Sequence, residues 1–279
     1  MQKMILLPAL ALAGGFGGFL LRSWELSTAF EATGLAVPWA PATTALVVLS
    51  LLMAAVFIFL CRKPRCAPKG YDDAFAVPNY GLYLPVSAAA CLCLLLAGLL
   101  GLRGELSGGT RGLLWLLLWV LCLVSFVCVL LAALASLRGR SKRPGILLLA
   151  PAYTLCVWLV AAYQKWAADP VVVNYMYELI AIICALLAFY FTAGFAFSRV
   201  KVRTCSVFCL LSVYFGIITL ADDHGTGQRL LVLFCILYQL ATAGVLLYNA
   251  FTVKPRRLLR NERMPGRAEN ETGEGTPAE

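Results

Sequence analysis

The sequence has 279 residues, of which 61% are hydrophobic and 13% are charged, and its formal net charge is +9. Soluble domains usually carry about 25% charged residues, so this composition and the mean hydropathy of +0.84 exclude a water-soluble fold. The Lys and Arg residues lie beside apolar blocks, where such residues orient membrane helices, and this placement argues against a nucleic-acid partner.

Apolar blocks of membrane-spanning length recur along the chain. A helix needs about 20 predominantly apolar residues to cross a bilayer. This rule predicts eight spans, near residues 4–21, 42–61, 84–102, 113–137, 146–164, 171–198, 205–221 and 230–251. We therefore expect an all-α fold, a polytopic membrane helix bundle of about eight transmembrane helices, in which residues 1–253 form one transmembrane domain embedded in a lipid bilayer.

The first apolar block has two interpretations. Lys3, the apolar run after it and the Ala11-Leu12-Ala13 triplet also resemble a cleavable signal peptide. The apolar stretch continues to Leu21, however, which is about the length that a spanning helix needs. The sequence favours a retained span, whereas cleavage would leave seven spans and an N-terminus outside.

The loops alternate strongly in positive charge. Loops on one predicted side of the membrane, together with the two chain ends, carry eighteen of the 23 Lys and Arg residues, and loops on the other side carry five. Because Lys and Arg concentrate in cytoplasmic loops, this bias predicts that both termini are cytoplasmic. The short loops favour a bacterial plasma membrane without excluding a eukaryotic one.

The end of the chain, residues 254–279, changes character. A basic run gives way to an acidic end containing Gly and Thr, which predicts a disordered cytoplasmic tail. Its basic segment, Lys254 to Arg267, follows directly after the last span. That position favours a topology anchor, and it would also allow contact with anionic lipid headgroups at about 1 kcal/mol per basic residue.

One carboxylate lies inside a predicted span. A charge at the bilayer centre costs at least about 2.5 to 3.5 kcal/mol, so Glu178 is the first candidate for a ligand-binding residue. Asn174 is one turn earlier on the same face, Tyr177 is adjacent, and Gln239 in the last span adds a further amide. The alternative, which the sequence favours, is a helix that begins near Tyr175 and leaves Glu178 at the outer interface.

Two other polar groups are weaker candidates. Asp222, Asp223 and His224 could bind a divalent metal, but adjacent residues rarely point at one ion, so we expect a solvated loop. Glu25 and Trp24 give the predicted outer loop after the first span an acidic and aromatic character. That combination is more typical of interfacial anchoring than of a ligand site.

Catalytic motifs are missing from the sequence. His224 is the only histidine, which excludes bis-histidine haem ligation within the chain and an H-E-x-x-H zinc site. The chain also lacks a phosphate-binding G-x-x-x-x-G-K-[ST] loop and a G-x-S-x-G elbow. We therefore expect no cofactor, no bound metal and no enzymatic activity.

Two functional classes remain open. The intramembrane carboxylate and scattered amides favour a small-solute transporter or a membrane sensor. Abundant Leu-rich surface and scarce intramembrane charge suit a structural or accessory subunit that packs against other membrane proteins equally well. An intramembrane enzyme acting on lipid is a more remote alternative.

Overall fold

The structure, a computed structural model, is built from helices. It describes residues 2–30, 37, 39–62, 68, 70–75, 80–107, 112–137, 144–167, 169, 171–197 and 199–251, and no β-strand occurs among them. The predicted tail, 254–279, and its basic segment lie outside the described residues. The all-helical class predicted from the sequence is confirmed.

Eight long helices follow the eight predicted apolar blocks in order. They are α1 (Gln2–Thr28), α2 (Pro41–Leu60), α4 (Tyr80–Ser107), α5 (Leu113–Leu137), α7 (Leu149–Trp166), α8 (Met176–Gly194), α9 (Val202–Thr219) and α10 (Thr226–Phe251). The short elements between them are α3 (Tyr71–Ala74), α6 (Pro144–Leu147) and the 3₁₀ helices η1 (Val172–Asn174) and η2 (Phe195–Phe197). A helix satisfies its own backbone hydrogen bonds, which is why apolar blocks of this length adopt it.

Seven of these helices are long and apolar enough to cross a membrane. The predicted span 146–164 corresponds to α7, which is not among the seven. Its 18 residues end in the polar sequence Tyr163, Gln164 and Lys165, which lowers its hydropathy. The chain is therefore a multi-pass membrane protein by the length and composition of its helices, and the predicted count of eight spans is not confirmed.

Two boundaries differ from the sequence prediction. Helix α1 continues to Thr28, beyond the predicted end at residue 21, so Glu25 lies within the helix and the prediction that it belongs to an outer loop is wrong. Helix α8 begins at Met176, because the residues before it form η1. Both differences occur at the same end of the bundle and determine which polar side chains meet there.

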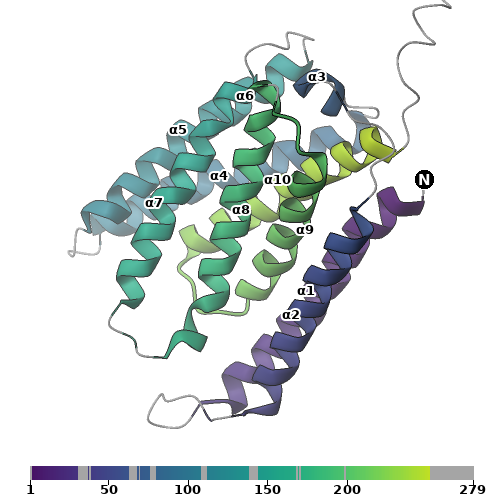
Figure 1. Ribbon diagram of the computed structural model, residues 1–279. Helices are drawn as coiled ribbons and strands as arrows, with labels where there is room; N and C mark the ends of the chain where they lie inside the picture. The colour runs from purple at the N-terminus through teal and green to yellow at the C-terminus, as the bar shows by residue number, and fades with distance from the viewer. Residues whose placement is uncertain are drawn as a thin grey trace, which may run out of the picture.

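Helices α9 and α10 form the centre of the bundle. Helix α9 packs against α1, α8 and α10, and α10 also packs against α4. Figure 1 shows α1 and α2 side by side on one flank, with α5 and α7 on the opposite flank. The outer helices expose large apolar side chains such as Leu51 and Phe59, as lipid-facing surfaces require.

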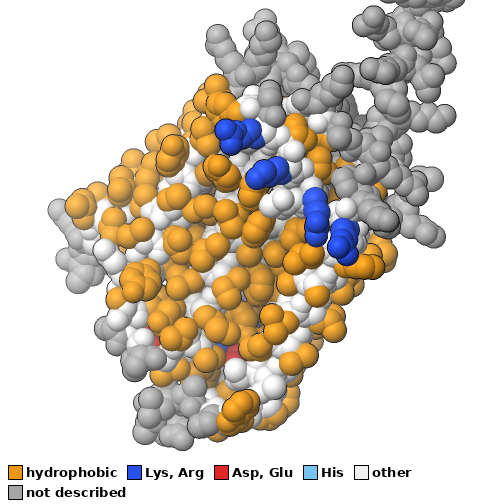
Figure 2. All heavy atoms as spheres, in the orientation of Figure 1, with side chains coloured by type: hydrophobic (Ala, Val, Ile, Leu, Met, Phe, Trp, Pro, Cys, Tyr) orange, Lys and Arg blue, Asp and Glu red, His pale blue; other side chains and the backbone are white. Residues whose placement is uncertain are grey.

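The two ends of the bundle differ in charge. The basic end, where α2 and α8 finish and α9 begins, carries exposed Arg62, Arg199, Lys201 and Arg203. Figure 2 shows Lys and Arg side chains gathered along that side of the molecule. The acidic end, where α1, α7 and α9 finish and α8 and α10 begin, holds the carboxylates with described side chains, namely Glu25, Glu105, Asp169, Glu178, Asp222 and Asp223.

Helices α4 and α10 meet at a pair of glycines, and this close approach gives a first testable prediction. A Cβ at Gly227 would lie 3.0 Å from the Cα of Gly101 and 3.0 Å from the ring of Trp119. Because a backbone atom cannot move aside as a flexible side chain can, we expect Gly227→Ala to destabilise the fold by about 1–3 kcal/mol. The measurement is the apparent melting temperature in mild detergent.

The matched control for this prediction is Gly244→Ala on the same helix. No described atom outside the local helix lies within 4 Å of a Cβ at Gly244. Alanine is favoured over glycine in a helix by about 1 kcal/mol, so this variant should melt at or above the wild-type temperature. Equal losses in both variants would show that the glycine crossing is not the cause.

Candidate functional site

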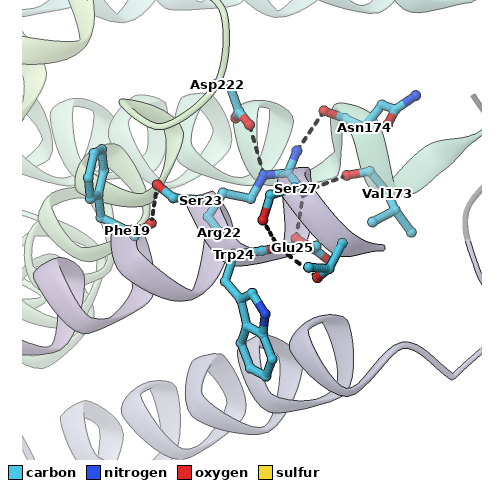
Figure 3. Close-up of polar contacts among 10 residues, drawn as sticks. Phe19, Arg22, Ser23, Trp24, Glu25, Ser27, Val173, Asn174 and Asp222 are labelled. Carbon is cyan, nitrogen blue, oxygen red and sulfur yellow. Dashed lines mark hydrogen bonds and ion pairs between the residues drawn. The ribbon is translucent and has the colours of Figure 1, made fainter. Parts of the chain in front are cut away.

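A buried charge cluster, formed by Arg22, Glu25 and Asp222, lies at the acidic end. The Arg22 side chain has no exposed surface. Its Nη1 donates to Glu25 Oε2 at 2.7 Å, and its Nε donates to Asp222 Oδ1 at 2.8 Å. Figure 3 shows Arg22 reaching from α1 toward Asp222, which comes from the loop between α9 and α10.

Arg22 also holds the segment that precedes α8. Its Nη1 donates to the carbonyl oxygen of Val173 at 3.1 Å, and its Nη2 donates to the carbonyl oxygen of Asn174 at 2.9 Å. The guanidinium carbon lies 5.2 Å from the centre of the Tyr177 ring, a cation–π distance. One side chain therefore joins α1, η1, the first turn of α8 and the α9–α10 loop.

The charges of this cluster do not balance. Arg22 is a single permanent cation, and it faces the two carboxylates Glu25 and Asp222. Each carboxylate uses one oxygen for Arg22, while Glu25 Oε1 and Asp222 Oδ2 are buried and find no hydrogen-bond partner in the described part of the chain. The cluster thus has unused acceptor capacity in a site that its own side chains shield from solvent.

Two of the three polar residues in the loop after α9 are buried, contrary to the sequence prediction of a solvated loop. Asp222 is 8% exposed and His224 is 4% exposed, whereas Asp223 points to the surface, where it pairs with Arg229 at 3.3 Å. Burial raises the pKa of Asp222, and the Arg22 guanidinium opposes that rise. Burial lowers the pKa of His224, and the Asp222 carboxylate opposes that fall.

Glu178 lies beside this cluster in the first turn of α8. The helix begins late, as one interpretation of the sequence predicted, and Glu178 lies in its first turn with its side chain buried. Glu178 Oε2 accepts a hydrogen bond from Trp166 Nε1 at 3.0 Å. Among the described residues, Glu178 Oε1 has no hydrogen-bond partner.

Tyr177, Asn174 and Gln239, the other predicted site residues, lie in different surroundings. Tyr177 is buried against Arg22, close to Glu178. Asn174 Nδ2 donates to Asp169 Oδ2 at 2.9 Å, and this bond, together with one from the backbone of Val171, lowers the pKa of Asp169.

Gln239 lies apart from the other three predicted residues. It is fully buried, thirteen residues beyond Thr226 at the start of α10, which places it about 20 Å along that helix from the acidic end. The structure therefore brings together Glu178, Tyr177 and Asn174 and does not bring Gln239 to them.

A small cavity extends inward from Glu178. The space open to the centre of a water molecule is about 10 Å³, which is near the smallest volume that holds one water. Trp158 and Ser212 line it together with Glu178, and each of these residues has a buried polar atom without a partner in the part of the chain that is described. The cavity has room for about one water molecule, and apolar side chains make up most of its lining.

Few local patterns in the sequence indicate the three residues of the charge cluster. Arg22 and Glu25 are three residues apart, a spacing that places both on one helical face, and this was the available local signal. Asp222 is 200 residues from Arg22, so no local sequence pattern indicates that the two side chains form a pair. His224 drew attention only as a possible metal ligand.

Metal binding and family membership add no further constraint on the site. Within the described ranges, no group of three or more His, Cys, Asp or Glu side chains is arranged to hold a metal ion. No protein-family model, curated protein or solved structure matches the chain. The charges and contacts of the residues themselves therefore carry the functional argument.

The charge cluster predicts a large effect of removing its cation. Arg22→Met leaves the Glu25 and Asp222 carboxylates buried without a counter-charge, a change that typically costs about 3–5 kcal/mol. We expect a lower apparent melting temperature and more aggregation during gel filtration in detergent. The triple variant Arg22→Met, Glu25→Gln, Asp222→Asn also removes the two negative charges. It should recover part of the lost melting temperature.

The matched control is Arg229→Met, which removes the arginine of the Arg229–Asp223 pair at the same end. Those side chains are 53% and 104% exposed, and exposed pairs contribute little because water screens them. Its melting temperature should stay close to that of the wild type. A loss in Arg22→Met no larger than this control would contradict a structural role for the buried cluster.

The burial of His224 predicts a loss of stability at acid pH. Because its pKa in the folded protein lies below the ordinary value of 6.5, the unfolded chain binds the proton first as the pH falls, and this favours unfolding. We expect the melting temperature of His224→Gln, relative to wild type, to rise as the pH is lowered from about 8 to about 5. A difference that stays constant with pH would mean that His224 is protonated equally easily in both states.

Proposed function

We propose that this chain is a non-enzymatic multi-pass membrane protein that binds a small solute at its acidic end and either transports the solute or transmits its presence. One observation carries the proposal. The buried guanidinium of Arg22 pairs with the two buried carboxylates Glu25 and Asp222, and a third buried carboxylate, Glu178, interacts electrostatically with Asp222. Ionisable residues within a membrane protein are costly, and by default they mark solute or proton pathways.

The excess of carboxylates indicates the charge of the solute. Glu178 and Asp222 interact electrostatically, and each adds negative charge to the site of the other. A buried carboxylate without a counter-charge costs several kcal/mol, so a positively charged species bound between them would be stabilised. We infer that the solute is a cation or a proton.

Tyr177, Asn174 and Gln239 take different roles in this proposal. Tyr177 lies against Arg22 and shapes the wall of the site, while the backbone of Asn174 accepts a bond from Arg22. The Asn174 side chain is engaged with Asp169 and is available to a solute only if that bond breaks. Gln239 lies deeper in the bundle, about 20 Å from the acidic end, and is not part of the site.

We also propose that α7 is an eighth span and that both termini are cytoplasmic, in a bacterial plasma membrane. Helix α7 lies alongside α5 and α8 within the bundle, which supports a spanning position (Figure 1). The exposed Arg199, Lys201 and Arg203 at the basic end support a cytoplasmic location of that end, because positive residues concentrate there. The Glu178 site would then open toward the outside.

Solute-dependent thermal stability tests the proposal. A ligand that binds only the folded state stabilises it by about 2.7 kcal/mol at a hundred times its dissociation constant. Wild-type protein should therefore melt at a higher temperature with at least one member of a panel of alkali-metal ions and ammonium, which are no larger than the space beside Glu178. We expect Glu178→Gln to lose this response.

The control variant is Glu105→Gln, which neutralises a carboxylate at the acidic end of α4, outside the cluster. It should keep the wild-type response. If no member of the panel shifts the wild type, or if Glu178→Gln responds equally, the solute proposal is wrong. A specific protein that co-purifies in mild detergent would then favour the accessory-subunit alternative.

A further inference from the structure

A second small cavity lies on the other side of the bundle centre from Glu178. Its lining is rich in hydroxyl groups, and the space open to the centre of a water molecule is again about 10 Å³. The residues that contribute hydroxyls are Tyr71, Tyr83, Thr192, Tyr238 and Thr242. We call it the tyrosine cavity and the first one the Glu178 cavity. Because α3 and the end of α8 contribute to it, the tyrosine cavity lies toward the basic end.

The two cavities lie along the same pair of helices. On α8, Ala185 lines the Glu178 cavity and Thr192 lines the tyrosine cavity. On α10, Cys235 lines the Glu178 cavity and Thr242 lines the tyrosine cavity. Both pairs are seven residues apart, which is about two helical turns on one face and about 10 Å along the axis. The cavities are therefore stacked one above the other between α8 and α10.

Three aromatic rings separate them. Phe189 follows Ala185 by one turn and precedes Thr192 by one turn, so it lies between the two levels on α8. Its ring centre is 5.8 Å from that of Phe234 and 5.0 Å from that of Tyr238, and the latter two are 5.7 Å apart. Phe189 and Phe234 are fully buried. The rings form an apolar layer, and only Tyr238 carries a hydroxyl into the tyrosine cavity.

Unpartnered polar atoms line the approach to this layer. Glu178 Oε1, Trp158 Nε1 and Ser212 Oγ belong to residues of the Glu178 cavity. All of these atoms are buried, and none has a hydrogen-bond partner in the portion of the chain with described side chains. A cavity water needs two to four such partners, so the Glu178 cavity is built to hold one.

We propose that these two cavities are the halves of a proton path through the bundle, with Glu178 as the proton-accepting group and the stack of Phe189, Phe234 and Tyr238 as its barrier. The inference rests on the proposed function, since it uses the same carboxylate and names the cation as a proton. The size of the cavities favours a proton over an organic cation, because each has room for about one water. Among the described residues, no group of three or more His, Cys, Asp or Glu side chains is arranged to hold a metal ion, which favours a proton over a metal cation.

The proposed transfer conserves every atom and charge. A hydronium at the acidic end gives its proton to Glu178 Oε1, which forms one O–H bond, leaves a water and converts the carboxylate to a neutral acid. The acid then gives the proton to the water in the Glu178 cavity. Movement of the Phe189 ring opens the way to the tyrosine cavity, where the proton passes to water and leaves toward the basic end.

The charges around Glu178 suit this role. Three titratable groups lie near it: Lys165 of α7 and Asp222 of the α9–α10 loop interact with it electrostatically, and Cys235 of α10 lines the same cavity. Lys165 places a positive charge near Glu178, and Asp222 places a negative charge near it. Because the two nearby charges have opposite sign, the Glu178 carboxyl can both accept and release a proton.

Proton flux into vesicles tests the path. Full-length protein is reconstituted in liposomes that contain a pH-sensitive dye, and a potassium gradient with valinomycin drives protons inward. Wild-type flux should exceed that of protein-free vesicles, and Glu178→Gln should fall to the protein-free level. Phe189→Ala removes the central ring and should raise the flux several-fold. Phe191→Ala, which removes a ring on the same helix that stacks on Phe208 outside the path, should match the wild type.

The outcomes separate this inference from the proposed function. If Glu178→Gln abolishes the response to cationic solutes but neither wild type nor Phe189→Ala exceeds protein-free vesicles, the proton path is wrong and the solute site stands. Flux that survives Glu178→Gln also overturns the path. Flux that depends on Glu178 without any solute response removes the solute proposal and keeps the proton assignment. If Phe189→Ala does not fold, Phe234→Leu thins the same barrier, and unchanged flux in that variant contradicts it.

Discussion

The acidic end depends on the burial of one guanidinium. Taking an arginine side chain out of water costs several kcal/mol, and only well-placed partners offset that cost. Arg22 has four hydrogen bonds, two to carboxylates and two to backbone carbonyls, which use most of its five N–H donors. Because these partners come from α1, η1 and the α9–α10 loop, removal of Arg22 would loosen three segments at once.

This interaction also determines the position of Glu178. Arg22 binds the carbonyls of Val173 and Asn174, which keeps η1 from continuing as a regular start of α8. Helix α8 therefore begins at Met176, and Glu178 falls in its first turn, where the partial positive charge of a helix N-terminus favours a carboxylate. The depth of the candidate proton acceptor is thus a consequence of a contact made by α1.

Hydropathy predicted the helices because each segment in a bilayer must satisfy its own backbone hydrogen bonds, so length and apolarity nearly suffice. It also selected Glu178 and Tyr177, since a carboxylate within an apolar block is rare. The same reasoning placed Glu25 and Asp222 in solvated loops, because their burial depends on Arg22, and Asp222 is 200 residues away from it in sequence. Gln239 was grouped with Glu178 by residue type, whereas helical rise separates them.

The buried charge cluster and the aromatic layer are held together by interactions of different strength. Four hydrogen bonds hold Arg22 at the acidic end, so α1 and the α9–α10 loop form the fixed part of the site. Phe189, Phe234 and Tyr238 are held by ring packing, and aromatic pairs contribute only about 0.5–1.5 kcal/mol beyond their burial. Along the proposed proton path, this apolar layer is therefore the part held by the weakest interactions. Opening at that layer requires ring movement between α8 and α10 and leaves the ion pairs intact.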